Sequence, residues 1–176
     1  LDIALPDGDD AFHFFGAGAP ALTPDGRTLV YVANRGGTQY VFRRRLDQTD
    51  SEIVSGTEGA MRVHVYPAGD WLAFTVSSEG LKKVPLSGGP PAAVYQPKTG
   101  VLGLDFTSAG DLVVGDHSYG LFRVPAAGGE PVSLLPDSTD GTPRYPVVLP
   151  GARGLLFTVG SEPVSNRIAV LPAGAP

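Results

Sequence analysis

The sequence predicts an all-β fold of the β-propeller type, with four blades of about 42 residues that are each a four-stranded antiparallel sheet. The phrase TPDGRTLVYV at 23–32 returns as YPAGDWLAFTV at 66–76, so a turn with Pro and Gly is twice followed by an alternating apolar run. The same turn recurs at a spacing typical of propeller blades. The composition is rich in Gly and Pro and is still strongly apolar.

The composition favours many short strands over disorder. The 176 residues include 24 Gly and 17 Pro, yet 42% of the residues are hydrophobic and only 18% are charged. Disordered chains combine low hydrophobicity with high charge. The glycines and prolines therefore mark turns between buried segments, and we expect no helix.

One position in each copy defines the repeat. The four repeat positions are separated by 43, 41 and 42 residues and are Pro24, Pro67, Ser108 and Pro150. Apolar residues then recur at every second place, which predicts the second strand of each blade. Five residues past the repeat position stand Leu29, Leu72, Val113 and Leu155. The third copy is the weakest, because Gly115 and His117 interrupt its apolar face.

The other strands follow in the same order in each copy. The first strand precedes the turn, with equivalent apolar residues at Leu22, Val65, Phe106 and Val148. A third strand is predicted at 40–46, 81–86, 121–126 and 167–172. A fourth strand is predicted at 51–55, 92–95 and 131–135. The single domain, 1–176, thus divides into repeats at approximately 17–58, 59–98, 99–140 and 141–176.

The fourth repeat lacks an outermost strand in this sequence, which predicts a partial propeller. The stretch LDIAL at 1–5 alternates like a strand and is the candidate closing strand of the last blade, in cis or in trans. Residues 6–19 are expected to connect it to the first blade. Three closures stay open: a fragment of a larger ring, four blades that close alone, and a homodimer through incomplete blades.

Charge and composition exclude several partners. The net charge is −5, whereas nucleic-acid-binding domains usually carry a basic surface, so we expect no nucleic-acid partner. The chain has no Cys, which excludes disulfides and thiolate metal sites. No apolar stretch approaches the roughly 20 residues of a membrane-spanning helix. We therefore expect membrane attachment only through a segment outside this chain.

Three segments carry a resemblance to a known family. ALTPDGRTLVYVA, FRRRLDQTDSEIVSGTEGA and GLKKVPLSGGPPAAVY resemble the WD40-like (TolB-like, PD40) β-propeller of bacterial transmembrane serine/threonine protein kinases. The opening LDIALPDG is similar to the entry strand of that family. The resemblance is densest from Ala21 to Tyr95. Family members of this type are complete propellers of about six or seven blades, whereas this chain carries four copies.

The resemblance implies a non-catalytic sensor domain on the periplasmic or extracellular face, which binds an unidentified small molecule or protein. We expect no enzyme activity from this chain, because it lacks a Gly-rich loop followed by a strand lysine, an H-R-D motif and a D-F-G motif. Two alternatives stay open. One is a scaffold that binds another protein, as in the periplasmic TolB propeller, and the other is the propeller domain of a prolyl-oligopeptidase-like hydrolase.

The candidate ligand-binding residues are His64 and Asp105. Both stand three residues before the repeat position, in consecutive blades. Because inner strands converge near a propeller axis, we expect the two side chains to meet, and the carboxylate would then raise the pKa of the histidine. A structural hydrogen bond between blades is the alternative explanation.

We expect no metal and no cofactor. The three histidines lie far apart and lack the spacing of metal ligands. The DGDD segment at 7–10 begins like a calcium loop, but the later ligands of such a loop are missing. Trp71, the sole Trp, is expected in the core or between blades. The basic run at 43–45 lies on a strand, where successive side chains point to opposite faces and cannot form one patch.

Overall fold

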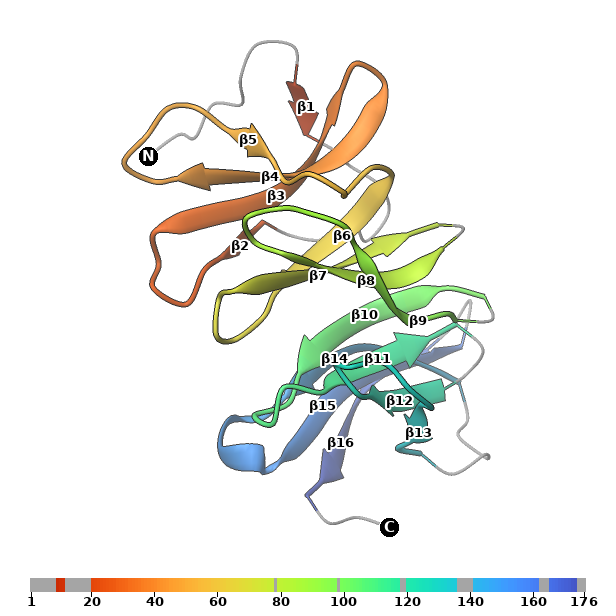
Figure 1. The fold of residues 1–176 in the computed structure, drawn as a ribbon. Helices are drawn as coiled ribbons and strands as arrows, with labels where there is room; N and C mark the ends of the chain where they lie inside the picture. Colours follow the sequence, from red (N-terminus) through yellow and green to blue (C-terminus); the bar gives the residue numbers. More distant parts are fainter. Residues whose placement is uncertain are drawn as a thin grey trace. The chain divides into compact units, whose positions relative to one another are not determined.

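The computed structural model describes residues 9–11, 20–77, 79–97, 99–117, 120–135, 141–161 and 165–173. It confirms the all-β fold, since these residues form four antiparallel sheets (Figure 1). Among them the helical structure is a single 3-10 turn, Pro150–Ala152, and no described helix has the length and apolar character needed to cross a membrane. The chain divides into two compact units, Leu1–Ala93 and Val94–Pro176.

The first sheet of the first unit contains five strands. They are β1 (Asp9–Ala11), β2 (Ala21–Leu22), β3 (Thr28–Arg35), β4 (Thr38–Arg45) and β5 (Glu52–Ile53). The prediction that residues 6–19 merely connect two elements is wrong for 9–11, because these residues pair with the far half of β3. The short β2 covers only Leu29 and Val30 of that long strand. The remaining edge of β3 therefore needs a second partner for its backbone groups, and β1 supplies it.

The second sheet lies mostly in the first unit and has the order of a four-stranded meander, whose last strand contains the boundary between the two units. Its strands are β6 (Ala60–Val65), β7 (Trp71–Val76), β8 (Gly80–Pro85) and β9 (Ala92–Tyr95). The two sheets of this unit share one apolar core. It contains fully buried side chains from both sheets, namely Val30, Val41, Leu72 and Phe74.

The second unit holds the other two sheets. The third sheet is formed by β10 (Val101–Phe106), β11 (Leu112–Asp116), β12 (Gly120–Val124) and β13 (Val132–Ser133). The fourth is formed by β14 (Thr142–Val148), β15 (Gly154–Ser161) and β16 (Ser165–Pro172). The candidate closing strand, residues 1–5, lies outside the described residues. The core between these sheets contains Val113, Leu121, Leu155, Phe157 and Val159.

The same turn joins the first and second strands of three sheets. The backbone N–H groups of Gly26, Gly69 and Gly110 each donate to the carbonyl three residues earlier, at 2.8, 2.7 and 2.9 Å. These glycines have φ values of 68°, 80° and 92°, a region that favours glycine because other residues meet steric strain there. The recurring Gly of the sequence is therefore required by the turn itself.

The third hairpin is one residue shorter than the others, which corrects the predicted alignment of that copy. Leu22 pairs with Leu29 and Val65 with Leu72, but Phe106 pairs with Leu112 rather than with Val113. The position equivalent to Leu29 is therefore Leu112. The supposed interruption by Gly115 and His117 disappears, because the strand face that begins at Leu112 continues through Val114 to Asp116, and these three residues are fully buried.

Candidate functional site

A shallow cavity lies at the start of β7, in the first unit. Its volume is about 360 Å³, and it is lined by Asp70, Trp71, Lys83, Val84, Pro85, Pro90 and Ala92. The strand register explains part of the lining. Trp71 pairs with Pro85, and Ala73 with Lys83, so the side chains of Trp71, Lys83 and Pro85 belong to one face of the β7–β8 hairpin. We call this cavity the Trp71 pocket.

Trp71 forms a supported aromatic surface in the pocket. Its ring stacks on Tyr66 with a centroid distance of 4.4 Å and an interplanar angle of 19°. Backbone pairing holds the two residues together across the turn, since the N–H of Tyr66 donates to the carbonyl of Trp71 at 3.0 Å. The ammonium of Lys83 lies 5.8 Å from the centroid of the Trp71 ring, a cation–π distance.

Trp71 is thus not buried in the core, one of the two places predicted for it, and a place between blades stays a prediction. The ring is half-buried, and it lines a cavity of the size that small ligands and peptide side chains occupy. The corrected alignment places Asp111 at the position equivalent to Trp71 in the third sheet. The pocket offers an aromatic plane, rigid proline walls, a cationic donor and a carboxylate, which suits binding by stacking and hydrogen bonds.

The two predicted site residues lie on equivalent strands in different units. His64 is on β6 and Asp105 is on β10. A neighbouring carboxylate was expected to raise the pKa of His64, but burial, with a smaller contribution from the charge of Arg62, lowers that pKa to about 4. The imidazole is therefore neutral near pH 7. A ligand-binding role for either residue stays a prediction.

The carboxylate of Asp105 binds backbone N–H groups within its own unit. Oδ1 accepts from the N–H of Phe106 at 2.8 Å, and Oδ2 accepts from the N–H of Val148 at 2.7 Å. The second bond joins β10 of the third sheet to β14 of the fourth. These contacts favour a structural role for the acidic residue at this position, because both oxygens have backbone donors.

A third polar site, around Asp116, was missed from the sequence. Asp116 is fully buried at the end of β11. Its carboxylate accepts a hydrogen bond from the hydroxyl of Tyr95 at 2.5 Å and lies 3.5 Å from the hydroxyl of Thr99. Thr99 lies in the loop between β9 and β10. With the corrected hairpin, Asp116 stands where the other sheets have Ala33, Val76 and Val159.

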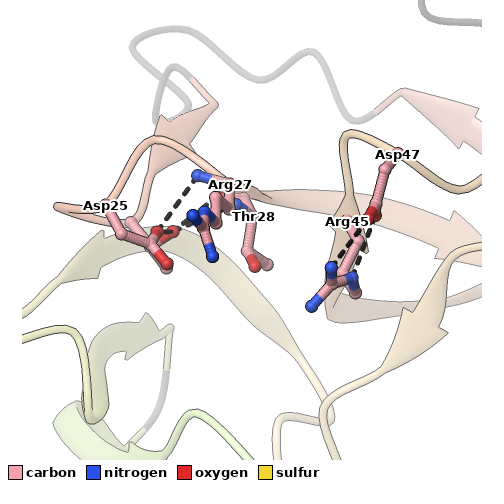
Figure 2. A network of polar contacts seen from close by, with 6 residues as sticks. Asp25, Arg27, Thr28, Arg45 and Asp47 are labelled. Carbon is pink, nitrogen blue, oxygen red and sulfur yellow. Dashed lines mark hydrogen bonds and ion pairs between the residues drawn. The ribbon is translucent and has the colours of Figure 1, made fainter.

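The first sheet carries an exposed polar network that is structural. Figure 2 shows Asp25 beside Arg27 and Thr28, with Arg45 and Asp47 forming a second group. Asp25 accepts from the hydroxyl of Thr23 at 2.5 Å and from the N–H of Arg27 at 3.0 Å, and these bonds lower its pKa. They fix the turn that precedes β3. The Asp of the first repeat thus closes a local turn, which other repeats build without it.

The three consecutive arginines on β4 have acceptors of different kinds. Arg43 binds Glu52 and the carbonyl of Leu86, while Arg45 binds Asp47. Both line a cavity of about 350 Å³, whereas Arg44 does not, as alternation along a strand requires. Arg44 donates instead to the carbonyl of Gln48 at 2.9 Å. Within the described residues no group of three or more His, Cys, Asp or Glu side chains could hold a metal ion.

The comparisons with known proteins identify the fold. TolB from Acinetobacter baumannii has a TM-score of 0.70 at 16% identity, over 91% of this chain and 42% of that chain. The putative TolB from Agrobacterium tumefaciens has a TM-score of 0.67 at 19% identity, over 88% of this chain and 57% of that chain. The Dos1 propeller has a TM-score of 0.61 at 9% identity, over 80% of this chain and 38% of that chain.

These likenesses confirm that the four sheets are β-propeller blades of the TolB-like kind. The chain spans 42% and 57% of the length of the two TolB chains, so it corresponds to part of such a propeller. No protein-family model matches the sequence. No curated protein sequence matches it either.

Proposed function

We propose that this chain is a non-catalytic, protein-binding propeller module whose Trp71 pocket receives an extended segment of the partner. The half-buried Trp71 ring, stacked on Tyr66 and open to a cavity of about 360 Å³, is the observation that carries the proposal. Trp and Tyr are enriched among the residues that contribute most to protein interfaces, because they bury a large rigid surface. A stacked pair of this kind loses little conformational entropy on binding.

The lining of the pocket favours a proline-containing segment in an extended conformation. Aromatic grooves recognise such segments because the polyproline conformation exists before binding and its rings pack on flat aromatic surfaces. Lys83 supplies a donor that suits a backbone carbonyl of the segment, and Asp70 supplies an acceptor at the pocket wall. The site therefore requires no particular net charge of its ligand.

The likeness to TolB-type propellers supports a scaffold that binds another protein, in preference to a kinase sensor or the propeller of a hydrolase. A sensor role beside a serine/threonine kinase, and a place outside the cytoplasm, rest on sequence resemblance alone. The residues encoded on either side of this segment discriminate between these contexts. A kinase domain and a spanning helix upstream would support the sensor role.

Fluorescence titration of Trp71 tests the proposal directly, because it is the sole Trp of the chain. We expect a saturable spectral change on addition of a proline decapeptide and none with a Gly-Ser decapeptide of the same length. The variant Lys83→Ala should weaken binding by about 10-fold or more, the value of one hydrogen bond with a charged donor. Absence of a saturable change with the proline peptide would contradict the proposed pocket.

The neighbouring lysine is the matched control. Lys82 lies next to Lys83 on β8 but pairs with Phe74 rather than Ala73, so it belongs to the other face of the strand. Its ammonium forms an ion pair with Glu79. Lys82→Ala should therefore leave the affinity for the proline peptide unchanged, and an equal loss in both lysine variants would show that the effect is one of net charge.

A further inference from the structure

The fourth sheet presents an exposed apolar face. Val147, Ile168 and Val170 are 48%, 74% and 57% exposed. Val147 pairs with Leu156, and Leu156 with Val170, while Thr158 pairs with Ile168, so these five side chains share one face of the sheet. We call it the outward face. The opposite face, with Leu155, Phe157 and Val159, belongs to the core shared with the third sheet.

The three other sheets bury the position that Ile168 occupies. The equivalent positions on the second strands lie three residues after Leu29, Leu72, Leu112 and Leu155. Their pairing partners on the third strands are, in the same order, Val41, Leu81, Leu121 and Ile168. Val41, Leu81 and Leu121 are each 0% exposed. Ile168, with 74% exposure, is the exception among four equivalent apolar side chains.

Within each unit, a neighbouring sheet covers this position. In the first unit, Val41 belongs to a core cluster with Leu72 and Phe74 of the second sheet. In the second unit, Leu121 belongs to a cluster with Leu155 and Phe157 of the fourth sheet. The natural cover of the outward face is therefore an apolar face of another sheet, since an exposed patch of this kind is costly in water.

The outward face also lacks a positive charge that the other sheets carry, because its residue at that position is Val170. The equivalent residues of the other sheets are basic: Arg43, Lys83 and Arg123. In the first unit, Arg43 donates to the carbonyl of Leu86 in the turn after β8 at 2.7 Å. Val170 replaces this cation with an apolar side chain, which removes like-charge repulsion if two copies of the face meet.

We propose that the outward face is an association surface whose occupant is the same face of a second copy of this chain. Face-to-face packing of identical patches is the commonest arrangement in soluble homo-oligomers. Head-to-tail packing would place the outward face of one copy against the first sheet of the other. The first sheet offers no exposed apolar surface for this at Tyr31, Ala33 and Phe42, which are 7%, 0% and 0% exposed. Two copies would thus bury Ile168 and Val170 against each other around a two-fold axis.

The mass of the intact chain in solution tests this surface. Sedimentation equilibrium over a wide concentration range should show association to twice the chain mass of 18.2 kDa. Val170→Lys should shift the chain to the monomer, because it places like charges at the centre of the contact. This variant keeps the fold, since basic residues occupy the same position in the three other sheets. Ile168→Arg should have the same effect.

Leu46→Arg is the control, because Leu46 is an apolar residue in the turn directly after β4, is 44% exposed and lies far from β16 in the sequence. It should leave the association unchanged. A wild-type chain that stays monomeric at all concentrations would overturn the proposal. In that case other residues of the chain, or a different protein, would bury the outward face. A dimer that survives Val170→Lys and Ile168→Arg would overturn it as well.

Discussion

The hydroxyl of Tyr95 donates a 2.5 Å hydrogen bond to Oδ2 of Asp116, a carboxylate that is fully buried. Burial and then this bond raise the pKa of Tyr95 above its ordinary range, so the hydroxyl stays protonated and remains a donor. Asp116 occupies a position that is apolar in the other sheets, where Ala33, Val76 and Val159 are buried. The bond is therefore a local feature of the second unit and not a property of every blade.

Removal of the Tyr95 hydroxyl should destabilise the fold. Tyr95→Phe deprives a buried carboxylate of its short donor, which costs about 1–3 kcal/mol in the free energy of unfolding. The double variant Tyr95→Phe with Asp116→Val should recover most of this loss, because Val stands at the equivalent places 76 and 159. Urea denaturation of the two variants measures the difference, and equal losses in both would contradict this account.

Truncation of Trp71 should cost less stability than truncation of a core residue. Its ring is half-buried and stacks on Tyr66, so Trp71→Ala should lower the free energy of unfolding by about 2 kcal/mol, the sum of partial burial and one aromatic pair. Phe74→Ala, three residues along the same strand, removes a side chain that is 1% exposed and should cost about 3–5 kcal/mol. A thermal melt in which Trp71→Ala is as damaging as Phe74→Ala would place the ring in the core after all.

His64 should make the protein less stable in mild acid. Its pKa is about 4 in the folded state and 6.5 ordinarily. Above pH 6.5 the imidazole is neutral in both states, so its contribution is fully present there. As the pH falls from 6.5 to about 4, the unfolded chain binds the proton more readily, and the contribution is lost, on the order of 3 kcal/mol. His64→Gln should flatten this part of the stability–pH curve measured by urea denaturation.

Residues 1–5 should contribute to the stability or the association of the chain. The fourth sheet has three described strands where the second and third have four, and an unpaired strand edge favours pairing with another segment. Deletion of residues 1–5 should therefore lower the melting temperature or change the mass in solution. Thermal melts and light scattering of the deletion variant check this, and no change in either quantity would exclude strand donation.

The repeat was predictable because glycine is tied to a turn that three sheets share. Gly26, Gly69 and Gly110 all stand at φ values that other residues avoid, so the spacing of these glycines is enough to indicate the hairpins. The alternating apolar residues after each turn then indicate the second strand. Both signals are local, and local signals survive in a single sequence.

The register of the third hairpin was not predictable in the same way. Two residues follow the turn glycine before the strand-pairing Leu in the first two sheets, whereas only Asp111 separates Gly110 from Leu112. Leu112, Val113 and Val114 are consecutive apolar residues, so either alignment gives an apolar start. The break at Gly115 and His117 was the available signal of the one-residue shift, and the correct shift would have revealed Asp116 as an acid on an apolar face.

The candidate pocket was predictable only in part. The sole Trp stands out in the sequence, but its stacking on Tyr66 depends on the backbone bond that joins positions 66 and 71 across the turn. The exposure of Ile168 is likewise invisible in the sequence, because Ile168 has the same apolar character as Val41, Leu81 and Leu121. The difference in exposure between Ile168 and its three equivalents depends on whether another part of the fold packs against the side chain, and that is a property of the tertiary structure.

The shorter turn at 107–111 limits how repeats of this chain can be recombined. Consider a chimaera that is joined directly after Gly110 and takes the following strand from another repeat. Its turn would be one residue longer than the native turn of the third hairpin, so the register of the pairing would shift by one residue. Each side chain of the transplanted strand would then fall on the wrong side of the blade. Exchange of whole hairpins, from the first residue of one strand to the last residue of the next, preserves sidedness and is the unit in which such a protein can be rebuilt.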